Sequence, residues 1–207
     1  MKNDNIIGPK AYINLDKCRS NLVAIKKSVG DKKLLCVVKA NGYGHGSVQI
    51  AKSIAKIKNV QFAVFSIDEA LALRKAKIKN KILVFSKLQK NNIELAYEEN
   101  IILNLSSFDD VKHIESFYLK NKVSPKYHLK FDTGMTRLGF DYEDYENIYQ
   151  YLFEHSHLKI KGIYSHFATA DEGDLSYAEI QLKLFNEILE HGKNLGFKFK
   201  YIHWSIM

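Results

Sequence analysis

The chain has 207 residues, of which 46% are hydrophobic and 26% are charged, a balance that is typical of a folded globular protein and excludes an intrinsically disordered one. The formal net charge of +8 makes nucleic-acid binding an alternative. However, the 31 Lys and Arg residues are scattered, without a dense basic block or an RNP-like aromatic motif. We therefore interpret the positive charge as a solvated surface and expect no nucleic-acid partner.

The sequence begins with polar residues, and no apolar run approaches the ~18 residues of a membrane span. We therefore expect neither a signal peptide nor a membrane partner. Cys18 and Cys36 lack the spacing of a metal site and are expected to be reduced core residues, which fits the cytoplasm. The eight His residues also lack metal-ligand spacing, so no metal is expected.

Strands and helices are predicted to alternate along the chain, at a spacing of roughly 20–35 residues. Apolar runs bounded by turn residues predict eight strands, at residues 11–15, 34–38, 61–65, 81–85, 101–105, 127–131, 159–166 and 199–203. Helical stripes follow each of the first seven, and four of these helices are expected to begin at the capping residues Asp16, Ser66, Ser107 and Ser176. Such alternation predicts an α/β protein with parallel strands.

Eight such units predict a closed (β/α)8 barrel of the TIM type, whose catalytic groups lie at the carboxyl ends of the strands. Polar and ionisable side chains do gather where strands end, at Lys39, Lys130, Asp132, Arg137, His166 and His203. A doubly wound open sheet is the alternative, but no Gly-x-Gly-x-x-Gly follows the first strand.

The most informative string is Val-Lys-Ala-Asn-Gly-Tyr-Gly-His-Gly, residues 38–46. It places Lys39 at the end of a strand that reads as buried on both faces, and three glycines then allow the backbone to turn tightly. A buried ammonium is costly unless it is partnered or neutralised, and forming an imine with a carbonyl removes its charge. The alternative is a strand-end lysine whose ammonium reaches water.

Two further strings follow later strands. Residues 130–140, Lys-Phe-Asp-Thr-Gly-Met-Thr-Arg-Leu-Gly-Phe, break from a strand into a loop that presents Arg137. A guanidinium suits a carboxylate or phenolate oxygen, although by itself this loop also fits a surface ion pair. In Ser-His-Phe-Ala, residues 165–168, His166 by itself is typical of a core histidine. We interpret Asp171, in the loop that follows, as a solvated residue.

Together these strings resemble the signatures of the alanine racemase family. The resemblance implies that pyridoxal 5'-phosphate is attached to Lys39, with Tyr43 beside it and His166 against the cofactor ring. It implies that Arg137 contacts the substrate carboxylate and the cofactor ring oxygen, and that Lys130 is the lysine often carbamylated in the family. The implied activity is the interconversion of L-alanine and D-alanine for peptidoglycan synthesis, in a cytoplasmic homodimer.

The resemblance also changes the strand count. In the family, the first strand (here residues 11–15) associates with a second domain, which leaves seven barrel strands from residue 34 onward. We therefore expect one cofactor-binding barrel domain over residues 1–207, truncated at its C-terminal end, with an N-terminal strand and helix in 1–30 and the barrel proper in 31–207. The family continues its seventh strand as His-x-x-Asn-Ser, whereas Ile206 and Met207 follow His203 here.

A racemase needs a base on each face of the reacting carbon, and the family's opposite-face tyrosine belongs to the part beyond this sequence. The isolated fragment is therefore expected to be weakly active or inactive. Two alternatives stay open: a non-catalytic barrel that binds pyridoxal phosphate or maintains its supply, and an inactive structural remnant of an interrupted racemase gene.

Overall fold

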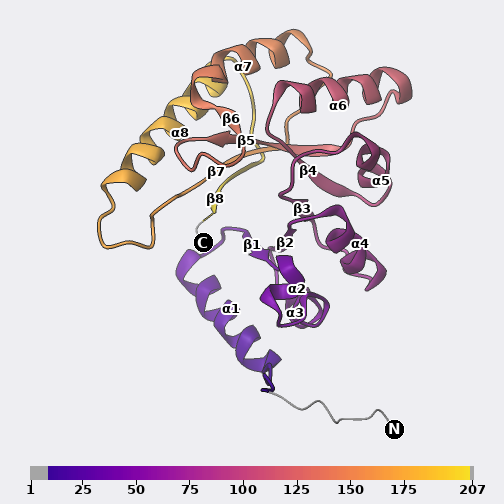
Figure 1. Ribbon diagram of the computed structural model, residues 1–207, viewed down its shortest axis with the longest axis vertical. Helices are drawn as coiled ribbons and strands as arrows, with labels where there is room; N and C mark the ends of the chain where they lie inside the picture. The colour runs from indigo at the N-terminus through magenta and orange to yellow at the C-terminus, as the bar shows by residue number, and fades with distance from the viewer. Residues whose placement is uncertain (1–8, 206–207) are drawn as a thin grey trace.

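A computed structural model describes residues 9–205 and shows parallel strands in the centre with the helices in an outer arc (Figure 1). The strands are β1 (Leu34–Val37), β2 (Val60–Val64), β3 (Ile82–Val84), β4 (Ile101–Leu105), β5 (Lys126–Asp132), β6 (Phe140–Asp141), β7 (Gly162–His166) and β8 (Tyr201–Ser205). The helices are α1 (Leu15–Val29), α2 (Lys39–Tyr43), α3 (Ser47–Ile54), α4 (Ile67–Lys75), α5 (Ile93–Glu98), α6 (Phe108–Asn121), α7 (Tyr145–Glu154) and α8 (Ser176–Asn194). None of the helices in this described part is long and apolar enough to cross a membrane.

The sheet has the strand order of an incomplete barrel. Seven strands pair in parallel in the order β1-β2-β3-β4-β5-β7-β8, and the short β6 pairs only with β5. This order follows the chain without reversal, as in a (β/α) barrel and unlike a doubly wound sheet. Within residues 9–205 no ladder joins β8 to β1. Instead, both strands line one cavity of about 450 Å³, and Lys33 Nζ lies 4.8 Å from the ring centre of Tyr201. The prediction of seven barrel strands is confirmed.

The predicted strand at residues 11–15 is wrong. Residues 11–14 have no regular secondary structure, and α1 already begins at Leu15. The reason is a local cap, because the side chain of Asn14 accepts a hydrogen bond from the backbone N–H of Lys17 at 2.9 Å. That bond satisfies a free amide of the first helical turn. It makes Asn14 the cap, so α1 begins before Asp16, the residue expected to cap it. The division into residues 1–30 and 31–207 stays a prediction.

The other predicted helix starts divide into two groups. Ser66 and Glu69 form the expected capping box at α4, and Ser107 caps α6 through the backbone N–H of Asp110. Ser176, by contrast, is the first residue of α8 and its side chain caps nothing. Its backbone N–H donates to Asp174 Oδ1 at 2.9 Å, so the loop aspartate has the role that was expected of the serine.

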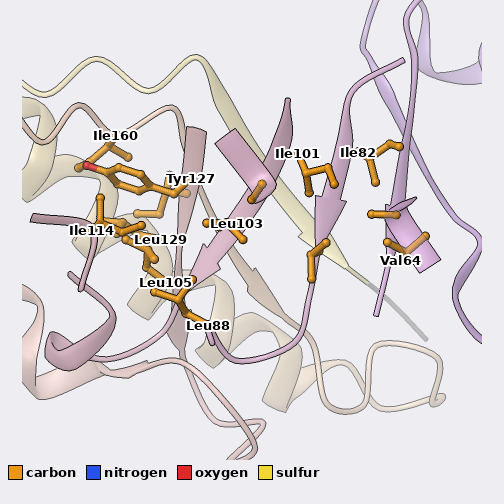
Figure 2. Close-up of a cluster of buried hydrophobic side chains, with 14 of the residues drawn as sticks. Val64, Ile82, Leu88, Ile101, Leu103, Leu105, Ile114, Tyr127, Leu129 and Ile160 are labelled. Carbon is orange, nitrogen blue, oxygen red and sulfur yellow. The ribbon is translucent and has the colours of Figure 1, made fainter. Parts of the chain in front are cut away.

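Both faces of the sheet are buried, which explains why the strands read as continuous apolar runs. The larger core lies between the sheet and the helices, and Figure 2 shows its side chains from β2 to β5, with Ile114 of α6 beside Tyr127 and Leu129 of β5. A smaller cluster of Ala63, Leu83 and Ile102 lies on the alternate strand positions, with Val37 and Phe85 packed against it. These alternate positions face the interior of the barrel, where the side chains of a site must lie.

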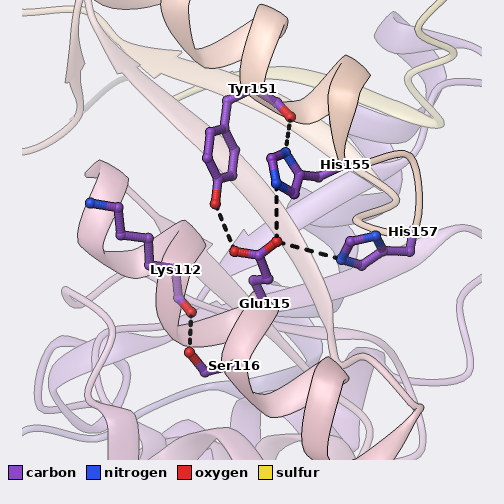
Figure 3. A network of polar contacts seen from close by, with 6 residues as sticks. All are labelled: Lys112, Glu115, Ser116, Tyr151, His155 and His157. Atoms are coloured by element: carbon purple, nitrogen blue, oxygen red, sulfur yellow. Dashed lines mark hydrogen bonds and ion pairs between the residues drawn. The ribbon is translucent and has the colours of Figure 1, made fainter.

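A polar network joins two outer helices (Figure 3). The carboxylate of Glu115 on α6 accepts a hydrogen bond from the hydroxyl of Tyr151 on α7 at 2.6 Å. His155 and His157, just after α7, place Nε2 atoms 3.3 Å and 3.8 Å from the same carboxylate. The segment after α7 leads into the amino end of β7, so this network lies at the opposite end of the barrel from the strand ends that carry Lys39 and His166.

Arg74 of α4 fastens two loops, because its guanidinium donates to four backbone carbonyls at 2.7–2.9 Å, those of Ile78, Asn80, Glu99 and Asn100. We expect Arg74→Met to lower the free energy of unfolding by about 2 kcal/mol, because four carbonyls, three of them in partly buried hydrogen bonds, lose a charged donor. Arg74→Lys, the matched control, should lose less. Urea unfolding measures both, and an unchanged midpoint in Arg74→Met would contradict this role.

Candidate active site

The five predicted site residues line one cavity at the carboxyl ends of the strands. Lys39 and Tyr43 follow β1, Lys130 lies on β5, Arg137 is in the loop after β5, and His166 ends β7. The cavity measures about 440 Å³ and is lined in full by Val37, Lys39, Tyr43, Phe65, Phe85, Ser86, Lys87, Lys130, Arg137, Leu138, Tyr164 and His166. The structure thus brings together residues that are up to 127 positions apart in the sequence (166 − 39).

Lys39 is half-buried, which corrects the expectation of a buried amine. The regular strand ends at Val37, so Lys39 opens the short α2 segment instead of continuing the strand. Its Nζ lies 5.9 Å from the ring centre of Tyr43, and that tyrosine is 59% exposed. The amine therefore lies at the mouth of the cavity, where a ligand can reach it.

The α2 segment that begins at Lys39 is a left-handed turn and not a regular α-helix. Ala40, Asn41, Gly42 and Tyr43 have φ values of 51°, 53°, 63° and 53°. Glycine is required at position 42, because a Cβ there would lie 3.2 Å from the backbone nitrogen of Ser47 and 3.3 Å from its Cα. The predicted tight turn is confirmed, and it orients Lys39 and Tyr43 toward the same cavity.

Lys130 is only 6% exposed, and burial lowers its pKa to about 8, assisted by the positive charge of Arg137 and opposed by Asp132. Burial alone would raise the pKa of Asp132, but hydrogen bonds from the backbone N–H groups of Thr136, Gly134 and Arg137 lower it overall. These three bonds, each 2.9 Å long, fix the loop that presents the exposed Arg137. A substantial fraction of Lys130 is therefore a neutral amine near pH 8.

His166 is a neutral imidazole at physiological pH. Burial lowers its pKa to about 4, and the positive charges of Arg137, Lys130 and Lys39 lower it further, while Asp132 opposes them. The side chain is 7% exposed, and its Nε2 is buried without a hydrogen-bond partner among the described residues. An unpaired buried ring nitrogen is costly, so a group that enters the cavity would be favoured if it bonded there.

His203 does not line the cavity, contrary to its predicted place among the strand-end residues. It lies in the middle of β8 and stacks on Tyr164, with ring centres 4.6 Å apart. The hydroxyl of Tyr164 donates to Asn104 Oδ1 at 2.9 Å, and His203 Nε2 lies 3.1 Å from His128 Nδ1. Asn104, His128 and His203 thus form a polar layer beneath the cavity, in contact with Tyr164, which lines it. The departure expected at residues 206 and 207 lies outside the described residues.

The prediction missed Phe65, Phe85 and Tyr164, which form aromatic walls of the cavity. Their positions could have been found from strand alternation. Ala63 and Leu83 face the barrel interior. Phe65 and Phe85 lie two residues after them, so strand alternation points them to the same side. Apolar walls around a few convergent polar groups are typical of small-molecule sites.

This fold and cavity define a (β/α) half-barrel with an amine-bearing site at the ends of its strands, a class of site that suits a carbonyl-containing cofactor. The family model described as "Alanine racemase, N-terminal domain" matches residues 13–205. The chain belongs to this family of alanine racemase N-terminal domains.

The similarity extends to curated proteins and solved structures. The chain is 36% identical over 193 residues to an alanine racemase of Carboxydothermus hydrogenoformans, covering 93% of this chain and 52% of that protein. It is 38% identical over 196 residues to an alanine racemase of Desulforamulus reducens, covering 93% of this chain and 53% of that protein.

The fold matches solved alanine racemase structures. The structure from Clostridium difficile 630 has a TM-score of 0.86 at 31% identity, covering 93% of this chain and 54% of that one. The structure from Bacillus anthracis has a TM-score of 0.84 at 33% identity, covering 96% of this chain and 53% of that one. The chain thus spans about half the length of these relatives.

The buried ammonium of Lys130 should destabilise the fold at neutral pH. Its pKa is about 8 in the folded protein against an ordinary 10.5, so between these values the unfolded chain binds more protons and stability rises with pH. We expect Lys130→Met to be more stable than wild type at pH 7, by at most about 3 kcal/mol, with the difference shrinking above pH 8 and vanishing only above the ordinary pKa of 10.5. Chemical unfolding from pH 7 to about pH 11, in buffer free of carbon dioxide, measures this. A difference independent of pH would contradict it.

Proposed function

We propose that this chain forms the cofactor-binding barrel of a pyridoxal-phosphate-dependent alanine racemase, which interconverts L-alanine and D-alanine. The observation that carries the proposal is the convergence of Lys39, Arg137 and a neutral His166 on one cavity. The printed names of the relatives supply the substrate. A B. anthracis structure in this family is described with bound L-Ala-P, which supports a small amino-acid ligand for that protein.

The residues present fit the cofactor, because an accessible amine and a histidine whose ring nitrogen has no partner among the described residues line one cavity with aromatic walls. When bound, pyridoxal phosphate supplies an electron sink for negative charge at the α-carbon of the amino acid. Lys39 would hold the cofactor and move a proton to and from that carbon on one face. Arg137 would bind the substrate carboxylate, and Tyr43 and His166 would orient the cofactor ring.

Lys130 is the proposed site of carbamylation. Its lowered pKa leaves part of the amine neutral near pH 8, and only the neutral form can attack carbon dioxide. Nζ first loses one proton to become the neutral amine; a bond then forms between Nζ and the carbon of carbon dioxide as one C=O π bond opens to a carboxylate, and a second proton is released to solvent. The side chain thereby changes from a cation into an anion that can pair with Arg137, which removes the repulsion between the two.

Neither of the tyrosines that line this cavity, Tyr43 and Tyr164, is suited to be the base on the opposite face. The hydroxyl of Tyr164 is hydrogen-bonded to Asn104, and burial raises the pKa of this tyrosine. Tyr43 lies beside Lys39 itself. We propose that a partner subunit supplies a tyrosine in a homodimer, and that the D-alanine product serves peptidoglycan synthesis in the cytoplasm.

Covalent capture of the cofactor tests the role of Lys39. Pyridoxal phosphate should give a visible absorption band with wild-type protein, and borohydride reduction followed by mass spectrometry should place the label on Lys39. Lys39→Ala should lose both signals. Lys87→Ala removes another lysine that lines the same cavity and should retain both. A label on Lys87, or an unchanged band in Lys39→Ala, would refute the assignment.

Racemisation tests the two-base requirement. The 207-residue polypeptide, assayed by itself with L-alanine, should turn over at least ~10²-fold more slowly than a full-length alanine racemase, because one general base is missing. Release of the α-hydrogen into deuterated solvent without inversion would indicate that the Lys39 face works alone. Turnover equal to that of a full-length enzyme would show that this chain contains both bases.

A further inference from the structure

The left-handed turn after Lys39 needs support from outside itself. Three non-glycine residues, Ala40, Asn41 and Tyr43, adopt positive φ in succession, a conformation that L-residues rarely adopt. Such a turn persists only where surrounding contacts determine it. Some contacts lie within the segment, since Gly44 N–H donates to the Ala40 carbonyl at 3.0 Å and Ser47 N–H donates to Asn41 Oδ1 at 3.1 Å. These bonds close the turn but do not attach it to the barrel.

The backbone attaches the turn through the Gly42 N–H, which donates to the Val38 carbonyl at 2.9 Å, and a second attachment comes from a carboxylate on a different βα unit. Glu69 Oε1 accepts a hydrogen bond from the backbone N–H of Ala40 at 2.6 Å, directly beside Lys39. Its other oxygen, Oε2, accepts from the backbone N–H groups of Phe65 at 2.7 Å and Ser66 at 3.2 Å. One half-buried side chain therefore joins the segment after β1 to the start of α4, 29 residues along the chain.

Both oxygens are needed, which explains why the residue is a carboxylate. A carboxylate accepts hydrogen bonds on either oxygen, whereas a glutamine amide offers one acceptor oxygen and one donor nitrogen. With glutamine at position 69, either Ala40 or the Phe65–Ser66 pair would face a donor. In the capping box of α4, only Oε2 of Glu69 accepts a hydrogen bond from the N-cap residue. The hydrogen bond from Ala40 to Oε1 therefore has no part in capping the helix.

We propose that Glu69 is a positioning residue for the site: its carboxylate clamps the turn that orients Lys39 and Tyr43, and simultaneously holds Phe65 in the cavity wall. The clamp explains how a strained segment keeps one amine at the mouth of the cavity. This inference deepens the proposed function and rests on it only where cofactor capture is concerned. The geometry of the turn can be tested without any cofactor.

The test compares Glu69→Gln with Ser66→Ala. Both variants disrupt the same capping box and should weaken α4, but Ser66→Ala leaves the Glu69–Ala40 bond intact. Hydrogen–deuterium exchange of cofactor-free protein, read in peptides covering residues 39–46, should be about tenfold faster in Glu69→Gln. Ser66→Ala should stay within about twofold of wild type in the same peptides, even where it lowers the unfolding midpoint.

Cofactor capture is the second readout. Glu69→Gln should capture pyridoxal phosphate about tenfold more slowly than wild type, as measured by reductive trapping, while Ser66→Ala captures it at the wild-type rate. Wild-type exchange in Glu69→Gln, or equal effects in the two variants, would overturn the clamp. If wild-type protein captures no cofactor while exchange follows the expected pattern, the proposed function fails and the clamp stands.

Discussion

The candidate site depends on an excess of positive charge within one cavity. Lys39, Lys130 and Arg137 share a cavity whose described lining includes no acidic side chain. The consequence is seen in the pKa values of Lys130 and His166, which burial lowers and neighbouring cations lower further. Such a site favours anions, and the proposed cofactor phosphate, the substrate carboxylate and a carbamate on Lys130 would each reduce the repulsion.

The barrel keeps this charge apart from its main apolar core. The strand ends and the interior layer beneath them carry the ionisable side chains, while the outer face of the sheet packs on the helices through apolar ones. Asp132 lies at the end of β5, between the core and the site. Its carboxylate accepts hydrogen bonds from three backbone N–H groups of its own loop, and these bonds fix the position of Arg137.

The amine of Lys39 depends on a different kind of support. A left-handed turn costs backbone energy, and the contacts that hold it come from both its own residues and Glu69 of a neighbouring unit. The site is thus determined less by individual side chains than by how consecutive βα units are fastened to one another. The opening between β1 and β8 leaves both edge strands with backbone groups that no described strand pairs.

The sequence by itself determined the strand and helix alternation, the parallel barrel and the residues at the strand ends. These follow from local patterns, because a strand buried on both faces is apolar and its polar neighbours fall at its ends. The tertiary structure alone decided that Lys39 is half-buried, that His203 lies one layer down, and that residues 11–14 form no strand. It also revealed the second role of Glu69, which reads in the sequence as a capping residue. Those outcomes depend on contacts between segments far apart in the chain, which local patterns do not encode.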